Sequence, residues 1–350
     1  MRFGLIGAGA IGAVRAAALT ELRGGALAGV HDLDEARALG LARGTRYFPT
    51  AGAMIESGDI DAVVLSTPPS THHDLALAAF AAGKHVLVEK PMAPSVDECR
   101  SMIAAAAKAG RFLAVGYNHR YFKALKRVRD VVESGSLGRL THVRGYAGHT
   151  GLSEFKSAWM YDRAAMGGGA LMDNGTHVVD LVRYIGGDFT QVYGHHANHV
   201  WKLDGVEDNA TALLRSDLGV LASVEASWSE WKGYRFYVEA YGTHGMARAY
   251  YAPMMALVVT LDEPGGKAKV ERNFYPGDII REKLKGWQCT VIDAFREEFG
   301  DFIAAARAGA VSGGERIATG FDGLRAVETA HAVYLSGEQG CAVMLSQDLR

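Results

Sequence analysis

The first third of the chain alternates short apolar runs with longer stretches of helical periodicity. Apolar runs of strand length occupy residues 1–6, 27–30, 61–65, 85–88 and 112–117. Each of the first four runs is followed by a stretch with helical spacing of its apolar residues. The first stretch ends at about residue 22, and the others cover residues 33–41, 75–82 and 95–109. Short strands separated by helices of this length predict a parallel sheet that is covered by helices.

Beyond residue 118 the pattern changes to consecutive strands. A charged amphipathic helix over residues 122–133 introduces this part of the chain. The predicted strands cover residues 139–148, 192–198, 210–215, 220–228, 234–242, 246–250 and 256–261. The predicted closing helices cover residues 290–308 and 321–336. Because consecutive strands favour antiparallel pairing, we predict a mostly antiparallel sheet and two domains, 1–118 and 119–350, with a C-terminal helix that could pack back on the first.

Composition and charge point to a globular protein with small-molecule partners. The 350 residues are 49% apolar and 22% charged. Because 37 Lys and Arg nearly balance 39 Asp and Glu, no net charge favours binding to nucleic acid or to an anionic membrane. Cys99, Cys289 and Cys341 form no C-x-x-C pair, which favours reduced thiols in a reducing compartment. No apolar run approaches the ~20 residues that span a bilayer, and no signal peptide is evident, so we expect a cytoplasmic protein.

A glycine-rich turn joins the first predicted strand to the first predicted helix. Gly7 permits a tight turn, Gly9 permits close approach of a pyrophosphate, and Gly12 permits close packing of the helix on the strand. Asp32 ends the second strand, where its carboxylate can accept hydrogen bonds from the adenosine ribose. The pattern predicts NAD rather than NADP, whose 2′-phosphate Asp32 would repel. The alternative is that Asp32 caps the helix over residues 33–41.

Three polar motifs follow predicted strands of the parallel sheet. They are Thr67-Pro68-Pro69, Glu89-Lys90-Pro91 and Tyr117-Asn118-His119. Ligands of such sheets bind beyond the carboxyl ends of the strands, so we expect the three motifs to line one rim. His72, at the helix start after the first motif, is expected near the cofactor.

The glycine-rich stretch that begins at Gly167 is the strongest candidate for the reaction centre. Its three glycines predict a loop with a flexible, close-approach backbone, and the apolar spacing after them predicts a helix that stops at Gly186-Gly187. On that helix Asp173, His177 and Asp180 fall at i, i+4 and i+7, within roughly 60° of one another. The alternative is that Asp173 caps exposed amides and His177 is a core histidine.

These motifs, together with Arg120, Gly168-Gly169 and the tail at residues 320–336, resemble the Gfo/Idh/MocA oxidoreductases over essentially the whole chain. The resemblance implies an α/β N-terminal Rossmann domain and an α+β C-terminal domain with an open, mostly antiparallel sheet. It also implies NAD- or NADP-dependent chemistry on sugars, inositols or related polyols, and homodimers or homotetramers formed through that sheet. The residues that match the family's catalytic group are Lys90, Asp173 and His177.

The expected site residues combine these motifs with their neighbours. The residues expected at the cofactor are Gly7, Gly9, Ala10, Ile11, Gly12, Asp32, Thr67, Pro68, His72, Glu89, Lys90 and Asn118. The residues expected at the substrate are Lys90, Asn118, Arg120, Trp159, Arg163, Asp173 and His177. Trp159 and Arg163 lie in an irregular stretch, where they could cover a sugar ring or only pack the loop.

Oxidation of a secondary alcohol needs a group that takes the hydroxyl proton while hydride leaves for the nicotinamide. His177 titrates near neutrality and is the favoured proton-transfer group, with Asp173 orienting it or a neighbouring hydroxyl. Lys90 would stabilise the developing alkoxide. The alternative assigns proton transfer to Lys90, whose pKa burial and the positive nicotinamide would lower.

We therefore expect an NAD-dependent dehydrogenase acting on CH–OH donors, with a sugar, inositol or related cyclic polyol as substrate. Two other functions remain open. One is a lyase or glycosidase that uses tightly bound NAD in a transient oxidation, and the other is a non-catalytic NAD-binding sensor. The joint presence of Lys90, Asp173 and His177 counts against the sensor.

Two further groups are given structural roles. His195 and His199 would share one face of a strand while His196 would not, and no acidic or thiol ligand lies nearby, so no metal site is expected. Trp228, Trp231 and the tyrosines of residues 234–251 are assigned to sheet packing or a subunit interface.

Overall fold

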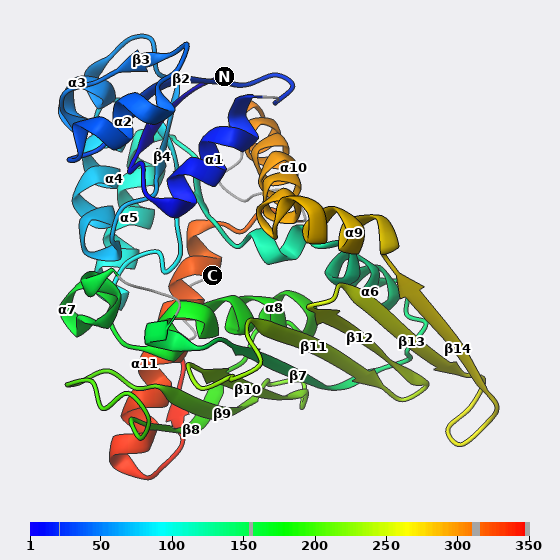
Figure 1. Ribbon diagram of the computed structural model, residues 1–350. Helices are drawn as coiled ribbons and strands as arrows, with labels where there is room; N and C mark the ends of the chain where they lie inside the picture. The colour runs from blue at the N-terminus through cyan, green and yellow to red at the C-terminus, as the bar shows by residue number, and fades with distance from the viewer. Residues whose placement is uncertain (21, 154–156, 310–315, 347–350) are drawn as a thin grey trace. The chain divides into compact units, whose positions relative to one another are not determined.

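The computed structural model describes residues 1–20, 22–153, 157–309 and 316–346, and the chain divides into two compact units (Figure 1). Unit 1 comprises Met1–Tyr121 and Leu284–Leu324, and unit 2 comprises Phe122–Lys283 and the chain from Arg325 onward. The segment Leu284–Leu324 lies beyond the boundary that the sequence analysis placed near residue 118.

Aromatic packing explains why this later segment belongs to unit 1. It carries helix α10 (Gln288–Arg307), whose Phe299 and Phe302 rings lie 5.2 and 5.8 Å from the ring of Phe3 in the first strand. All three rings are buried. Burial of apolar area of this size, rather than closeness in sequence, decides which unit a helix joins.

Unit 1 is built on a six-stranded parallel sheet in the order β3-β2-β1-β4-β5-β6. Its strands are β1 (Arg2–Ile6), β2 (Ala26–His31), β3 (Arg46–Tyr47), β4 (Ala62–Leu65), β5 (His85–Val88) and β6 (Leu113–Val115). Its other helices are α1 (Ala10–Thr20), α2 (Glu35–Leu41), α3 (Ala51–Glu56), α4 (His72–Ala81), α5 (Val96–Ala109) and the 3₁₀ turn η2 (Asn118–Tyr121). The predicted parallel sheet is confirmed, and its order reverses between β1 and β4, where doubly wound sheets bind ligands.

Unit 2 contains a nine-stranded sheet in the order β14-β13-β12-β11-β7-β10-β9-β8-β15. Its strands are β7 (Leu140–Gly148), β8 (Gln191–Ala197), β9 (Asn209–Arg215), β10 (Leu221–Ser227), β11 (Arg235–Gly242), β12 (Gly245–Tyr251), β13 (Met255–Leu261), β14 (Ala268–Phe274) and β15 (Val343–Met344). Only β7 and β10 pair in parallel, so the predicted mostly antiparallel sheet is confirmed.

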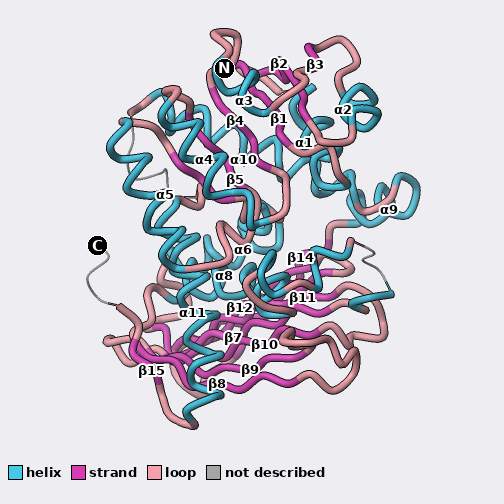
Figure 2. Tube along the Cα trace, turned by 90° about the vertical axis from the view of Figure 1, so that its left-hand side faces the viewer, coloured by secondary structure: helices cyan, strands magenta, loops and turns pink. Residues whose placement is uncertain are grey.

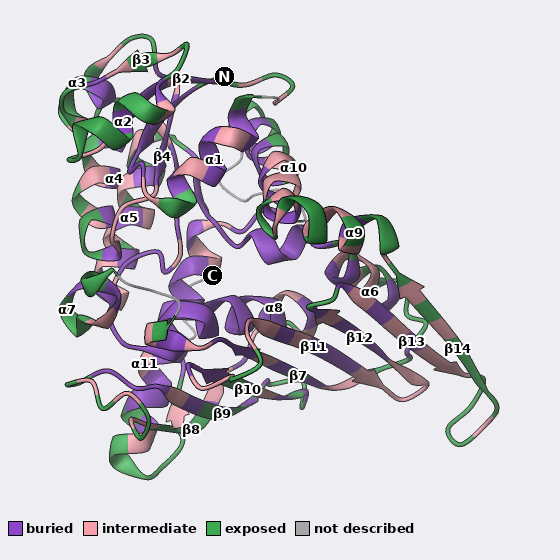
Figure 3. Cartoon of the chain, in the orientation of Figure 1, coloured by how far each residue is buried: buried purple, intermediate pink, exposed green. Residues whose placement is uncertain are grey.

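Helices cover one face of this sheet. They include α6 (Lys123–Glu133) and α8 (Thr176–Gly186), which lie along the sheet in Figure 2. A Cβ atom at Gly145 of β7 would meet Val178 of α8 at 2.4 Å, so this face is tightly packed. Nearly the whole of α8 is buried (Figure 3), and its neighbours include β7, β10 and β11 of the sheet.

Several elements were not predicted. They are β3, α3, β14, α9 (Pro276–Lys285) and β15. β14 is an edge strand with mostly exposed positions, and β3 and β15 have two residues each, so none shows a clear apolar period. Among the described residues, no helix is both long and apolar enough to cross a membrane.

Candidate active site

The glycine turn of unit 1 fits a bound dinucleotide. Gly7 has a left-handed backbone (φ +100°), and a Cβ atom there would lie 2.5 Å from the carbonyl oxygen of Ser66. A Cβ atom at Gly12 would lie 2.0 Å from the carbonyl oxygen of Gly7, whereas one at Gly9 would meet nothing within 4 Å. Gly7 and Gly12 are therefore required by the fold, whereas Gly9 leaves the backbone open to a pyrophosphate.

The carboxylate of Asp32 is fixed beside this turn. Its Oδ2 accepts the Ala8 N–H at 2.6 Å, and its Oδ1 accepts the Asp34 N–H at 2.8 Å. The residue that caps α2 is Asp34, whose side chain accepts the Arg37 N–H, so the interpretation of Asp32 as a helix cap is wrong. At the end of β2 a carboxylate held in this way fits the ribose of an adenosine. At the start of α1, Ala10 and Ile11 are exposed, as contact with a cofactor requires.

Lys90 lies in a loop that is anchored on its amino-terminal side by a buried ion-pair network. The neighbouring Glu89 accepts a hydrogen bond from Arg15 Nε at 2.7 Å and pairs with its Nη2 at 2.6 Å. Arg15 is completely buried and also pairs with Glu298 of α10. Burial raises the pKa of Glu298 to about 7, although Arg15 opposes the shift. Glu89, which was expected at the cofactor, directs its carboxylate to Arg15.

His72 anchors the same loop on its other side. The His72 ring is fully buried, with Nε2 2.9 Å from the Thr67 carbonyl oxygen and Nδ1 3.2 Å from those of Pro91 and Met92. Burial lowers the pKa of His72. His72, also expected near the cofactor, therefore connects the two loops that follow β4 and β5. The Thr67 hydroxyl lies 2.6 Å from the Thr71 hydroxyl.

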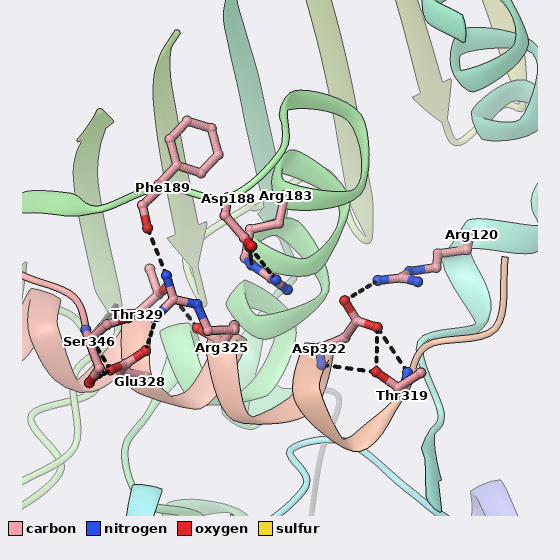
Figure 4. A network of polar contacts seen from close by, with 10 residues as sticks. All are labelled: Arg120, Arg183, Asp188, Phe189, Thr319, Asp322, Arg325, Glu328, Thr329 and Ser346. Carbon is pink, nitrogen blue, oxygen red and sulfur yellow. Dashed lines mark hydrogen bonds and ion pairs between the residues drawn. The ribbon is translucent and has the colours of Figure 1, made fainter. Parts of the chain in front are cut away.

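The third rim motif is buried in unit 1 with Asn118 in η2. Burial, with the positive charge of Lys90 nearby, lowers the pKa of His119 to about 3, so its imidazole is neutral at physiological pH. Arg120, which was expected at the substrate, pairs with Asp322 at 3.2 Å (Figure 4). It also donates to the Arg316 carbonyl oxygen at 3.3 Å.

In unit 2 the three glycines before Asp173 are buried, and the predicted close approach of their backbone to other segments is observed. Gly167 has φ +85° and ends the short helix α7 (Arg163–Met166). Cβ atoms at Gly168 and Gly169 would lie 2.0 Å from the Tyr334 hydroxyl oxygen and 1.9 Å from a backbone carbonyl oxygen. These glycines are required by close packing rather than by mobility.

Asp173 lies in a π-helical turn, Leu171–Gly175, that leads into α8. The predicted helix is therefore not regular at its start, and such turns are frequent at functional sites. Asp173, His177 and Asp180 are all buried, and Asp173 lies inside the π-turn rather than at the N-cap of either helix, so its interpretation as a cap is wrong.

Two residues that the sequence analysis did not assign to the site hold the Asp173 carboxylate. Its Oδ2 lies 2.8 Å from His149 Nε2 and accepts the Trp228 indole N–H at 3.1 Å. Because the Gly151 N–H donates to His149 Nδ1 at 2.9 Å, His149 Nε2 carries the proton and donates to Asp173. Trp228, assigned above to packing or an interface, is fully buried at this carboxylate.

Strand register explains how His149 and Trp228 meet. They directly follow β7 and β10, which pair in parallel with Gly148 opposite Ser227, so their carboxyl ends coincide. The rule that placed the rim of unit 1 would have found both residues, had this one parallel pair been recognised.

Arg163 and Trp159 were expected to cover a sugar ring or to pack the loop. Arg163 donates to the Gly205 carbonyl oxygen at 3.2 Å and lines a cavity of about 180 Å³ with Tyr334. Trp159 is 36% exposed. Tyr161, between them, packs its ring edge-on against Trp228 at 5.6 Å, and burial near Asp173 raises the pKa of Tyr161 to about 12. His195 and His196 are exposed on β8, and no group of three potential metal ligands occurs among the described residues.

The parallel sheet with its glycine turn and its carboxylate at the end of β2 defines a dinucleotide-binding domain. Residues 1–117 match the oxidoreductase family with an NAD-binding Rossmann fold, and residues 125–248 match the GFO/IDH/MocA C-terminal domain. The chain belongs to the Gfo/Idh/MocA family and is an NAD-binding oxidoreductase.

Similar proteins of known name cover nearly the whole chain. The rhizopine catabolism protein MocA of Rhizobium meliloti is 29% identical, over 95% of this chain and 93% of its own length. Inositol 2-dehydrogenase 2 of Saccharopolyspora erythraea is also 29% identical, over 95% and 91%. The crystal structure of GenD2 from gentamicin A biosynthesis, in complex with NAD, superposes with a TM-score of 0.82 at 27% identity, over 99% and 96% of the two chains.

Proposed function

We propose that the protein is an NAD-dependent dehydrogenase that acts on a secondary hydroxyl of a sugar, inositol or related cyclic polyol, or reduces the matching carbonyl. The observation that carries the proposal is the buried Asp173 carboxylate, fixed by two donors in a π-turn that leads directly to His177. A sensor would need the glycine turn but not this cluster. Among the relatives, one is named an inositol 2-dehydrogenase.

The proposed roles divide between the two units. Unit 1 binds NAD, which supplies the hydride acceptor, and presents Lys90 to stabilise negative charge on the substrate oxygen. In unit 2, His177 takes the hydroxyl proton during oxidation and returns it during reduction. Asp173, oriented by its two donors, fixes His177 or a neighbouring substrate hydroxyl.

The test is the absorbance of reduced nicotinamide after purified protein is mixed with NAD and a panel of inositols, aldoses, glycosides and sugar acids. We expect a rise with at least one cyclic polyol or sugar. NADP in parallel tests cofactor choice. A silent panel, with NAD tightly bound to the purified protein, would replace the dehydrogenase by the lyase or glycosidase that regenerates its own NAD.

Asp32 is proposed to select NAD over NADP. Asp32→Asn should weaken NAD binding by about tenfold, because a hydrogen bond to a charged group contributes ~1.5 kcal/mol. It should also narrow the preference over NADP, since the repulsion of the 2′-phosphate is removed. Dissociation constants of both cofactors measure the effect, with Asp34→Asn as the matched control. Unchanged constants would exclude contact of Asp32 with the ribose.

His149 is proposed to keep the Asp173 carboxylate oriented. His149→Ala should lower kcat by about tenfold, because it removes one donor to a buried carboxylate. The control is His195→Ala, which removes an exposed histidine from β8 of the same unit. Equal kcat values for the two variants would show that the hydrogen bond to Asp173 does not contribute to turnover.

We propose that the outer face of the nine-stranded sheet forms a homodimer or homotetramer interface. Gly145 faces α8, so its neighbours in β7 face away from the helices, where Tyr146 stacks on Tyr237 at 5.6 Å and His142 stacks on Tyr241 at 4.3 Å. Partly exposed aromatic rings are typical of subunit interfaces. Light scattering should give a dimer or tetramer for the wild type and a smaller species for Tyr237→Glu. A monomeric wild type would refute the interface.

A further inference from the structure

A buried carboxylate in unit 2 holds the glycine segment that precedes Asp173. Glu207 is 4% exposed, and its Oε2 accepts the Gly169 N–H at 2.7 Å while its Oε1 accepts the Leu171 N–H at 2.8 Å. Its own backbone carbonyl accepts the intervening Ala170 N–H at 3.0 Å. Three consecutive amides of the segment are therefore satisfied by one residue, which fixes the backbone much as a helix cap does.

The hydroxyl of Tyr334, on helix α11 (Gly320–Gln339), fixes this carboxylate in turn. It donates to Glu207 Oε1 at 3.0 Å, and both side chains are buried. Burial raises the pKa of Tyr334 well above its ordinary value, so the phenol remains a donor at any physiological pH. Burial also raises the pKa of Glu207, against the effect of the loop amides. A carboxylate with three donors is oriented much more narrowly than one with a single donor.

The dipeptide Glu207-Asp208 connects both to the Asp173 backbone and to Trp228, one of the two donors to the Asp173 carboxylate. On one side, the Asp173 N–H donates at 2.9 Å to the carbonyl of Gly169, which Glu207 holds. On the other side, the backbone carbonyl of Asp208 accepts a hydrogen bond from the backbone N–H of Trp228 at 2.7 Å. Glu207 and Asp208 thus set the position of the Asp173 backbone and of the indole that donates to its carboxylate.

We propose that Glu207 and Tyr334 are positioning residues that hold Asp173 against His149 and Trp228, and that turnover depends on them although they act only through the glycine segment. This inference rests on the proposed dehydrogenase function. It also accounts for Gly168 and Gly169, since a Cβ atom at either would collide with Tyr334 or with Glu207.

The test compares Tyr334→Phe and Glu207→Gln with the control Tyr193→Phe. Tyr193 is 40% exposed on β8 of the same unit, and its hydroxyl contacts only the neighbouring His195 among the hydrogen bonds described for it. Tyr334→Phe removes one hydroxyl and keeps the ring. We expect kcat to fall by roughly 10- to 100-fold in Tyr334→Phe, since small displacements of catalytic groups have effects of this size. The KM for NAD should not change, and Tyr193→Phe should behave as wild type.

The split between kcat and KM separates positioning from a merely structural role. Displacement of Asp173 from its donors should lower kcat per folded enzyme and leave the KM for NAD unchanged. A structural role would lower the melting temperature and leave kcat per folded enzyme unchanged, which would overturn the proposal. Glu207→Gln keeps one acceptor oxygen and should show the same fall in kcat.

Hydrogen exchange gives a readout that does not need a substrate. The amides of residues 169–171 should exchange at least tenfold faster in Tyr334→Phe than in wild type or Tyr193→Phe, with no change in the glycine turn of unit 1. Unchanged exchange would refute the proposal that Glu207 and Tyr334 hold the glycine segment, even if the enzyme is a dehydrogenase. If the wild type is inactive but these amides respond as expected, the proposed dehydrogenase function is refuted. The conclusion that Glu207 fixes the glycine segment then still stands.

Discussion

His177→Ala should lower kcat by about 100-fold or more while leaving the dissociation constant of NAD unchanged. General acid–base catalysis by a positioned side chain contributes at least this factor. NAD is expected to bind in unit 1, whereas His177 lies in the first turn of α8 in unit 2, so cofactor binding should survive. Turnover is measured from reduced nicotinamide and binding by titration calorimetry. Wild-type turnover in this variant would refute the assigned role.

The pH profile of the same variant decides between His177 and Lys90 as the proton-transfer group. If His177 accepts the proton, the oxidation rate of the wild type falls as the pH drops through the histidine range, and His177→Ala loses that limb. If Lys90 accepts the proton, the limb remains in His177→Ala and disappears in Lys90→Met. A variant of His119 is the matched control and should keep the acid limb. Burial in unit 1 lowers the pKa of His119, so its imidazole stays neutral throughout this pH range.

The sheets of both units were predictable because their strands follow apolar periods. β1, β4 and β5 are almost completely buried runs, and β9 alternates between buried and exposed positions. β14 escaped prediction because its positions are mostly exposed, so no buried face imposes the apolar period. Periodicity therefore detects strands through burial and fails where burial is absent.

The site was predictable only where its residues belong to local motifs. Asp173 and His177 were selected by their spacing, but His149 and Trp228 lie 24 and 55 residues away from Asp173 in sequence. Their contact depends on the parallel pairing of β7 with β10, which no local pattern encodes. The glycines before Asp173 predicted a close approach but not the segments that they approach, since the collision that a Cβ atom would make is visible only in the packed structure.

Strand ends located the rim residues of unit 1 without giving the direction of their side chains. Glu89 and His72 follow the expected elements, yet both face inward, Glu89 to Arg15 and His72 to backbone carbonyls. Together they hold the loop that carries Lys90. A charged residue at a strand end is thus as compatible with anchoring a loop as with binding a ligand, and only its partners distinguish the two.

The largest expected effect on stability comes from removing the guanidinium of Arg15. It is fully buried, pairs with both Glu89 and Glu298, and lies 3.7 Å from the centre of the Phe295 ring. Arg15→Met keeps much of the apolar stem but leaves two carboxylates without their cation. We expect a loss of about 3–5 kcal/mol in the free energy of unfolding, as for other buried pairs that lose one partner. Urea unfolding measures it, and the control Arg37→Met, which breaks an exposed pair, should cost under about 1 kcal/mol.

The loss in Arg15→Met should increase with pH, which identifies its electrostatic origin. The pKa of Glu298 is about 7 in the folded wild type, above the ordinary glutamate value, so ionisation of this group destabilises the native state as the pH rises toward and through 7. Without Arg15 that pKa rises further, and the difference from wild type should be larger at pH 8 than at pH 6, where Glu298 is mostly protonated in both folded proteins. Adding Glu298→Gln removes one of the two carboxylates and should recover part of the loss. A loss that is equal at both pH values and unaffected by Glu298→Gln would assign the role of Arg15 to packing against Phe295 rather than to its charge.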